Sequence, residues 1–203
     1  MKSTIATALA LPLLASSPAI ASEWGIDGSH SSAQFSVRHM MVSNVRGVFG
    51  KLSGKLLLDE EDITRSSVEA TIEVDSIDTR DRARDEHLKG ADFFDVQKFP
   101  TMTFKSKKIN KVGEGALEVR GDLTIRGVTR EVVLAVSGLG AEMKDPWGNV
   151  KRGASATTTI NRKDFGLTWN KVLETGGVLV GEEVAITIDV ELNKKAAPAV
   201  GAK

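Results

Sequence analysis

The sequence predicts an all-β protein, a single antiparallel barrel of about eight strands with one short helical lid. Apolar and polar residues alternate with a period of two through most of the chain, which is typical of strands with one buried face. Only residues 80–100 and 163–181 leave this pattern for longer than a loop. A sheet of this size must bury its apolar face, and closure also removes its unpaired edges, so a barrel is favoured over a sandwich.

The strands follow from the alternation and from the glycine-rich turns that separate them. In the last strand Val184, Ile186 and Ile188 share the inward face, and the polar residues between them face outward. The expected strands are residues 23–27, 33–40, 45–58 with a bulge near Gly50, 68–76, 102–109, 117–126, 132–136, 154–160 and 184–192.

One helix is expected after the strand at residues 68–76, beginning at Asp78 or Thr79, which are both good N-cap residues. Its spacing places Ala83, His87 and Ala91 on one face. The chain then runs into four of its seven phenylalanines. Residues 80–95 are therefore interpreted as a lid over one end of the barrel, with His87 facing inward.

The ends of the chain are predicted to lie outside the folded domain. Residues 1–21 have the features of a cleavable signal peptide, with Lys2, an apolar run over residues 5–15 and a small-residue site ending at Ala21. Cleavage after Ala21 would release the protein into the periplasm. The domain then spans residues 22–193, and residues 194–203 are expected to be a disordered tail.

Composition excludes several classes of protein. The 27 basic and 27 acidic residues balance and are interspersed, so nothing indicates a nucleic-acid partner. The chain has no cysteine, which excludes a disulfide framework and leaves stability to the core.

No metal site or catalytic residue is expected. The three histidines lack the spacing that directs two imidazoles at one ion. Asp27, Ser29 and His30 are residue types of a catalytic triad, but they lie too close together on one turn. The acidic residues of the helix alternate with arginines, which indicates a solvated surface.

An eight-stranded barrel is either filled by side chains or holds one small ligand. Small inward residues such as Ala33, Ala70 and Gly121 favour a ligand space, although bulky neighbours could fill it. His39 occupies the same alternate strand positions as Phe35 and Val37, so it is expected to face inward, where it would meet a polar head group. Strand parity and position beside the lid predict a wall made of Phe35, Val37, Phe49, Phe93, Phe94, Phe104, Phe165 and Trp169.

Motifs along the chain resemble the YceI-like family of exported, polyisoprenoid-binding proteins. The match is ordered and runs from Trp24 to about Leu192. It includes Trp24-x-Ile26-Asp27-x-x-His30-Ser31, Phe35-x-Val37-x-His39, Asp92-Phe93-Phe94-Asp95, Phe99-Pro100-x-x-Thr103-Phe104 and Arg162-x-Asp164-Phe165-Gly166.

The resemblance implies an extended, lipocalin-like barrel whose tube holds an isoprenoid lipid of polyprenyl or quinone type. It implies no cofactor and no catalytic residue, so a binding, transport or storage protein is favoured over an enzyme. Transient membrane contact and a monomeric or homodimeric state are left open. Two alternatives remain: an isoprenoid-modifying enzyme using His39 or His87 as acid or base, and a ligand-free envelope stress protein.

Overall fold

The structure is a computed structural model that describes residues 21–174 and 176–196. The expected signal peptide lies outside these residues except for Ala21, as do residues 197–203 of the expected tail. The helical segments are α1 (Arg82–Lys89), η1 (Ile63–Arg65), η2 (Val74–Ser76) and η3 (Arg162–Phe165). The strands are β1 (Ser22–Ile26), β2 (Ser32–His39), β3 (Ser43–Phe49), β4 (Leu52–Leu58), β5 (Ser67–Glu73), β6 (Ile77–Asp78), β7 (Thr101–Gly113), β8 (Ala116–Ile125), β9 (Val128–Ser137), β10 (Met143–Lys144), β11 (Val150–Asn161) and β12 (Val180–Lys194).

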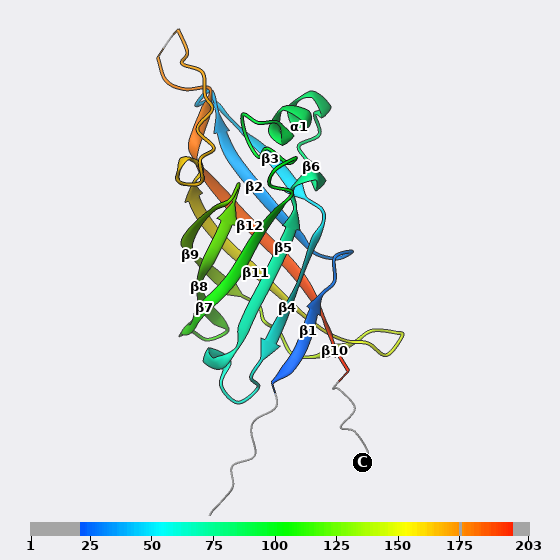
Figure 1. Cartoon of the computed structure of the whole chain (residues 1–203). Coiled ribbons are helices and arrows are strands. Elements are labelled where there is room, and N and C mark those ends of the chain that lie inside the picture. Colours follow the sequence, from blue (N-terminus) through cyan, green and yellow to red (C-terminus); the bar gives the residue numbers. More distant parts are fainter. Residues whose placement is uncertain (1–20, 175, 197–203) are drawn as a thin grey trace, which may run out of the picture.

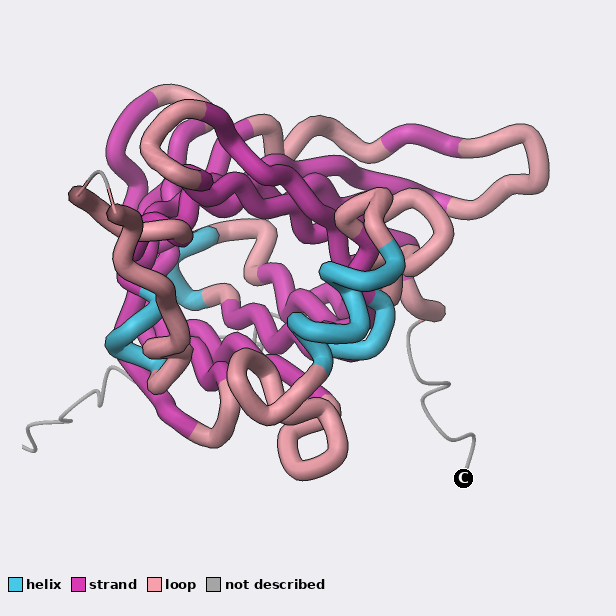
Figure 2. Tube along the Cα trace, turned by 90° about the horizontal axis from the view of Figure 1, so that it is seen from above, coloured by secondary structure: helices cyan, strands magenta, loops and turns pink. Residues whose placement is uncertain are grey.

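The strands form a closed antiparallel barrel, as the alternation predicted (Figure 1). β1 and β2 follow one another along β12 and act as a single interrupted strand, and β4 and β3 pair with them in the same way. From β4 the sheet continues through β5, β7, β8, β9 and β11, and β11 pairs with β12 to close the ring. The ring of strands is clear from above (Figure 2).

The single strand predicted over residues 45–58 with a bulge near Gly50 is instead two strands, β3 and β4, which are separated at Gly50 and pair with different neighbours. A second glycine allows a close approach of two strands. Gly54 has a φ of 156°, and an added Cβ would lie 2.2 Å from the backbone oxygen of Glu69. Only glycine permits this contact, which brings β4 tightly against β5.

Inward residues of the strands pack into three apolar clusters. One lies at the α1 end around Phe49, Phe93 and Phe165. Another, at the end near the chain termini, is centred on Trp24, which is 0 % exposed. The third packs Phe104 with its neighbours on β7, β8 and β9. The barrel interior between the clusters at its two ends is lined mainly by apolar side chains.

The helix is present but begins later than predicted. Its N-cap is Asp81, whose carboxylate accepts a hydrogen bond from the backbone N–H of Arg84 at 3.0 Å. Asp78 is the last residue of β6 and pairs with Val48 of β3, so it is unavailable as a cap. The predicted N-cap was wrong because a short strand extends to that point.

The predicted inward face of the helix was also wrong. Ala83, His87 and Ala91 are exposed, and Leu88 faces the barrel instead. The N–H and the hydroxyl of Thr79 donate to one carboxylate oxygen of Asp85 at 2.9 and 2.6 Å. This contact fixes the rotation of the helix about its axis.

The barrel domain extends slightly beyond its predicted end. Lys194, expected to begin the tail, is the last residue of β12, and its ammonium lies 2.6 Å from a carboxylate oxygen of Glu142. Among the described residues, no helix is both long and apolar enough to cross a membrane.

Candidate ligand-binding cavity

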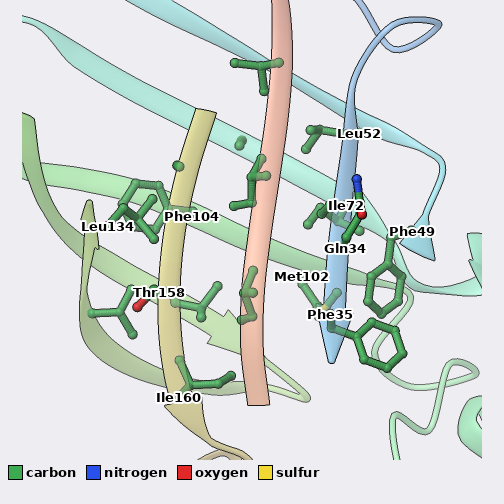
Figure 3. Close-up of a pocket in the computed structure, with 18 of the residues that line it drawn as sticks. Gln34, Phe35, Phe49, Leu52, Ile72, Met102, Phe104, Leu134, Thr158 and Ile160 are labelled. Carbon is green, nitrogen blue, oxygen red and sulfur yellow. The ribbon is translucent and has the colours of Figure 1, made fainter. Parts of the chain in front are cut away.

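A cavity of about 290 Å³ runs inside the barrel and receives side chains from all of its long strands. Figure 3 shows Phe35, Phe49 and Met102 on one side of it and Phe104 and Leu134 on the other. The polar residues in its lining are few: Gln34, Ser66, Thr103, Ser155, Thr158 and Arg162. A cavity lined mainly by apolar side chains favours apolar molecules over water.

Aromatic rings form the wall toward the α1 end. Phe35 and Phe49 lie with ring centroids 5.7 Å apart, and Phe49 meets Phe94 edge to face at 5.7 Å. Gly47 makes room for this arrangement, because a Cβ there would lie 2.5 Å from the Phe35 ring. The lid segment thus contributes directly to the wall through Phe94.

Phe104 occupies the middle of the barrel on β7. Its ring covers Gly121 of β8, where an added Cβ would lie 2.5 Å from the ring. Gly121 was expected to leave space inside the barrel. In the structure that space holds the Phe104 ring, because the two residues lie on adjacent strands and one accommodates the other.

Six of the residues predicted for the site line the cavity: Phe35, Val37, Phe49, Phe93, Phe94 and Phe104. Phe165 and Trp169 do not. Phe165, 2 % exposed, is part of the packed core that closes the barrel at the α1 end, and Trp169 packs against that core. Both residues belong to η3 and the segment after it, which lie above the strands rather than in them.

The two histidines predicted to face inward also lie outside the cavity lining. His39 is the last residue of β2 and is half-buried beside Val180 of β12. His87 lies on the outer side of α1 with its Nε2 3.0 Å from a carboxylate oxygen of Asp92. Its ring meets those of Phe93 and Trp169 edge to face, at 5.1 and 4.9 Å. His87 therefore joins the lid to the segment that follows η3.

Arg162 is a cavity residue that sequence reasoning did not single out. It is 5 % exposed, and its guanidinium donates to the backbone carbonyls of Leu167, Trp169, Val180 and Gly181. Burial lowers the pKa of Arg162, which nonetheless stays charged. The only signal in the sequence was its position in the Arg-x-Asp-Phe-Gly motif, and the motif gives no indication of burial.

Asp27, His30 and Glu191 meet on the outer surface, with potential ligand atoms within 4.8 Å of one another. The ammonium of Lys151 lies 3.1 Å from Asp27 and 2.5 Å from Glu191, where a cation would bind. Hydrogen bonds from His30 and Lys151 hold the pKa of the Asp27 carboxyl well below its usual range. We interpret the group as an ion pair that fixes β1 against β11 and β12.

The fold and the cavity define the class of this protein: a closed antiparallel barrel around an apolar interior. A family model described as the YceI-like domain matches residues 24–192, and this chain belongs to that family.

Comparisons with individual proteins agree. A UPF0312 protein of Staphylococcus aureus strain N315 is 38 % identical over 82 % of this chain and 95 % of its own length. The crystal structure of a Campylobacter jejuni YceI protein is 32 % identical, with a TM-score of 0.66, over 78 % of this chain and 90 % of that one. A polyisoprenoid binding domain from Saccharophagus degradans, 13 % identical, shares the fold with a TM-score of 0.60 over 85 % of this chain and 98 % of its own.

Proposed function

We propose that this protein binds a long-chain isoprenoid lipid, of polyprenyl or quinone type, inside its barrel. The observation that carries the proposal is the cavity, whose wall is apolar along the length of the barrel. Membership of the YceI-like family supports the same ligand class, as does the name of the Saccharophagus degradans domain with this fold. An isoprenoid chain presents only carbon and hydrogen to such a wall, so no buried polar group is left without a partner.

Burial of the lipid chain supplies the binding energy. Each buried CH₂ contributes about 0.8 kcal/mol, and ordering of the flexible chain offsets part of the total. A methylene more or less changes binding in an apolar pocket by only about 1 to 3 kcal/mol. We therefore expect the protein to accept isoprenoids over a range of chain lengths.

Transport or storage of the lipid would take place in the periplasm after cleavage of the signal peptide behind Ala21. The support is the sequence pattern of residues 1–21. N-terminal sequencing of the protein from a cell envelope should begin at Ser22. A retained Met1 would contradict this location.

Binding without conversion is favoured over catalysis. An enzyme would need an acid or base beside the reacting atoms, and neither His39 nor His87 lines the cavity. The Arg162 guanidinium reaches it, but four backbone carbonyls already engage this group. The described cavity thus offers the surface for holding a lipid and few groups for acting on one.

The test is to purify the protein from its own envelope, extract it with organic solvent and identify co-purifying lipid by mass spectrometry. An unmodified isoprenoid in the parent is the expected result. Phe104→Asp places a charge in the wall and should abolish retention. Lys108→Asp, on an exposed position of the same strand, should retain the lipid. No isoprenoid in the parent, or a chemically altered one, would overturn the proposal.

A further inference from the structure

Exposed apolar side chains gather at the lid end of the barrel, on the tips of two neighbouring segments. Met40, Met41 and Val42 form the turn between β2 and β3, and Val172 lies in the segment between η3 and β12. Val42 is 75 % and Val172 85 % exposed. The backbone N–H of Met40 donates to the carbonyl of Leu179 at 2.8 Å, which joins the turn to the end of the segment that carries Val172.

The turn between β2 and β3 is unfavourable for the fold. Met40 and Met41 adopt φ values of 49° and 61°, a left-handed conformation that a tight hairpin turn normally assigns to Asn and Gly. Each such residue costs about 1 kcal/mol or more relative to a regular conformation. In this conformation the turn presents two methionines to the outside.

The tips carry positive charge at their base. Arg38, Arg46 and Lys171 are the basic residues of the segments 38–46 and 169–179, and Glu174 is the acidic one. The Arg38 guanidinium donates to the carbonyl of Met41 at 3.0 Å, so its charge lies directly beneath the turn. Apolar tips above basic residues are the arrangement that binds the interface of an anionic membrane.

The opposite end of the barrel also exposes apolar residues, but in a different setting. Met143 and Trp147 lie on the hairpin of β10 and β11, which projects away from the barrel (Figures 1 and 2). The same end carries the consecutive acidic residues 59–62, of which Asp59 and Glu61 pair with Arg65 and Glu60 pairs with Arg152. It is closed by Trp24.

We propose that the two tips, Met40–Met41–Val42 and Val172, dock the lid end of the barrel on the surface of an anionic lipid bilayer. The inference rests on the proposed function, because an isoprenoid must leave a membrane to enter the barrel. Val37 of β2 lies three residues before Met40, and Val180, the first residue of β12, pairs with His39 beside the turn; both valines line the cavity. Docking therefore places the membrane next to the cavity wall and to the lid.

The test measures binding to vesicles made of equal parts of phosphatidylcholine and phosphatidylglycerol. The parent should bind, and added salt should weaken its binding. Met41→Ser combined with Val42→Ser and Val172→Ser should reduce the vesicle-bound partition coefficient about tenfold or more. Met143→Ser combined with Trp147→Ser removes similarly exposed residues at the other end. The partition coefficient of this variant should stay within about twofold of the parent value.

Several outcomes would overturn the proposal: no binding by the parent, equal binding by the tip variant, or an equal loss in both variants. Circular dichroism confirms that each variant is folded. Lipid extracted from the same preparations tests the proposed function separately. Normal lipid content with vesicle binding unaffected by the tips would defeat the docking surface alone, and an absence of lipid in the parent would defeat the lipid ligand itself.

Discussion

Gly121 shows how a single residue shapes the cavity wall. A Cβ there would lie 2.5 Å from both the Phe104 ring and the backbone oxygen of Lys105. The ring could move, but the backbone is held by its strand. We expect Gly121→Ala to lower the free energy of unfolding in urea by about 1 to 3 kcal/mol. Gly50→Ala adds a methyl group where no atom lies within 4 Å. This substitution should change the free energy of unfolding by less than about 0.5 kcal/mol.

Asp27 makes stability depend on pH. His30 and Lys151 lower its pKa in the folded state, so the folded protein favours the charged carboxylate. Its contribution is complete above the unfolded pKa of about 3.9 and is lost as the pH falls through the folded pKa. We therefore expect Asp27→Asn to destabilise the protein most at neutral pH, and the difference from the parent to shrink below about pH 4. A difference that is constant with pH, measured by urea unfolding, would contradict this.

Individual residues also show where sequence reasoning ends. Parity correctly placed Phe35, Val37 and Phe104 in the wall, because alternation is a property of the strand itself. His39 occupies the same alternate positions of β2 but, as the last residue of that strand, does not line the cavity. Arg162 could not be predicted to be buried, since its partners are carbonyls of a segment whose path depends on the whole fold.

At the scale of elements, α1 was predictable and its orientation was not. Helical spacing predicts a helix beginning at Asp78 or Thr79, and the helix forms a few residues later, at Arg82–Lys89. Its inward face is decided by Thr79 and Asp85, which are joined across the turn that precedes the helix. A periodicity argument that counts apolar residues is misled here, because the contact that anchors the helix is polar.

The segment between η3 and β12 is organised by Arg162. Its guanidinium gathers four backbone carbonyls, of which, among the described residues, only that of Val180 also accepts from a second side chain, Asn170 Nδ2 at 2.7 Å. We expect Arg162→Met to lower the free energy of unfolding by roughly 3 kcal/mol or more, since each orphaned polar group costs about 1 to 3 kcal/mol. Arg126→Met is a suitable comparison, because that half-buried guanidinium donates to only two carbonyls. An equal effect of both substitutions on urea unfolding would argue against this role.

For the whole molecule, sequence predicted the closed barrel because the need to bury one face and remove free edges applies to the entire sheet. The pairing of β11 with β12 closes the sheet and so removes its free edges. The cavity itself could not be predicted, because its volume is a small difference between the space inside the barrel and the side chains that enter it. The Phe104 ring over Gly121 shows how one pair of residues changes that difference.

A closed barrel has no strand edge that can part easily, so a ligand must enter or leave at an end. The lid is attached there by Asp85, which accepts both hydrogen bonds from Thr79, and by Arg84, which donates to the carbonyl of Thr79 at 2.8 Å. Asp85→Ala removes an acceptor whose charge-assisted hydrogen bonds are worth about 1.5 to 3 kcal/mol. Opening of the lid should therefore become easier. Transfer of a fluorescent polyprenyl lipid from the loaded protein to vesicles should accelerate about tenfold or more.

Glu86→Ala is the matched control, because Glu86 neighbours Asp85 on the exposed side of α1. It should leave the transfer rate unchanged, and neither variant should alter the amount of lipid bound at equilibrium, since neither residue lines the cavity. Equal transfer rates in the parent and Asp85→Ala would mean that the lipid passes elsewhere, with the end closed by Trp24 as the next route to test. A faster rate accompanied by lost lipid would instead indicate that the lid is part of the binding wall.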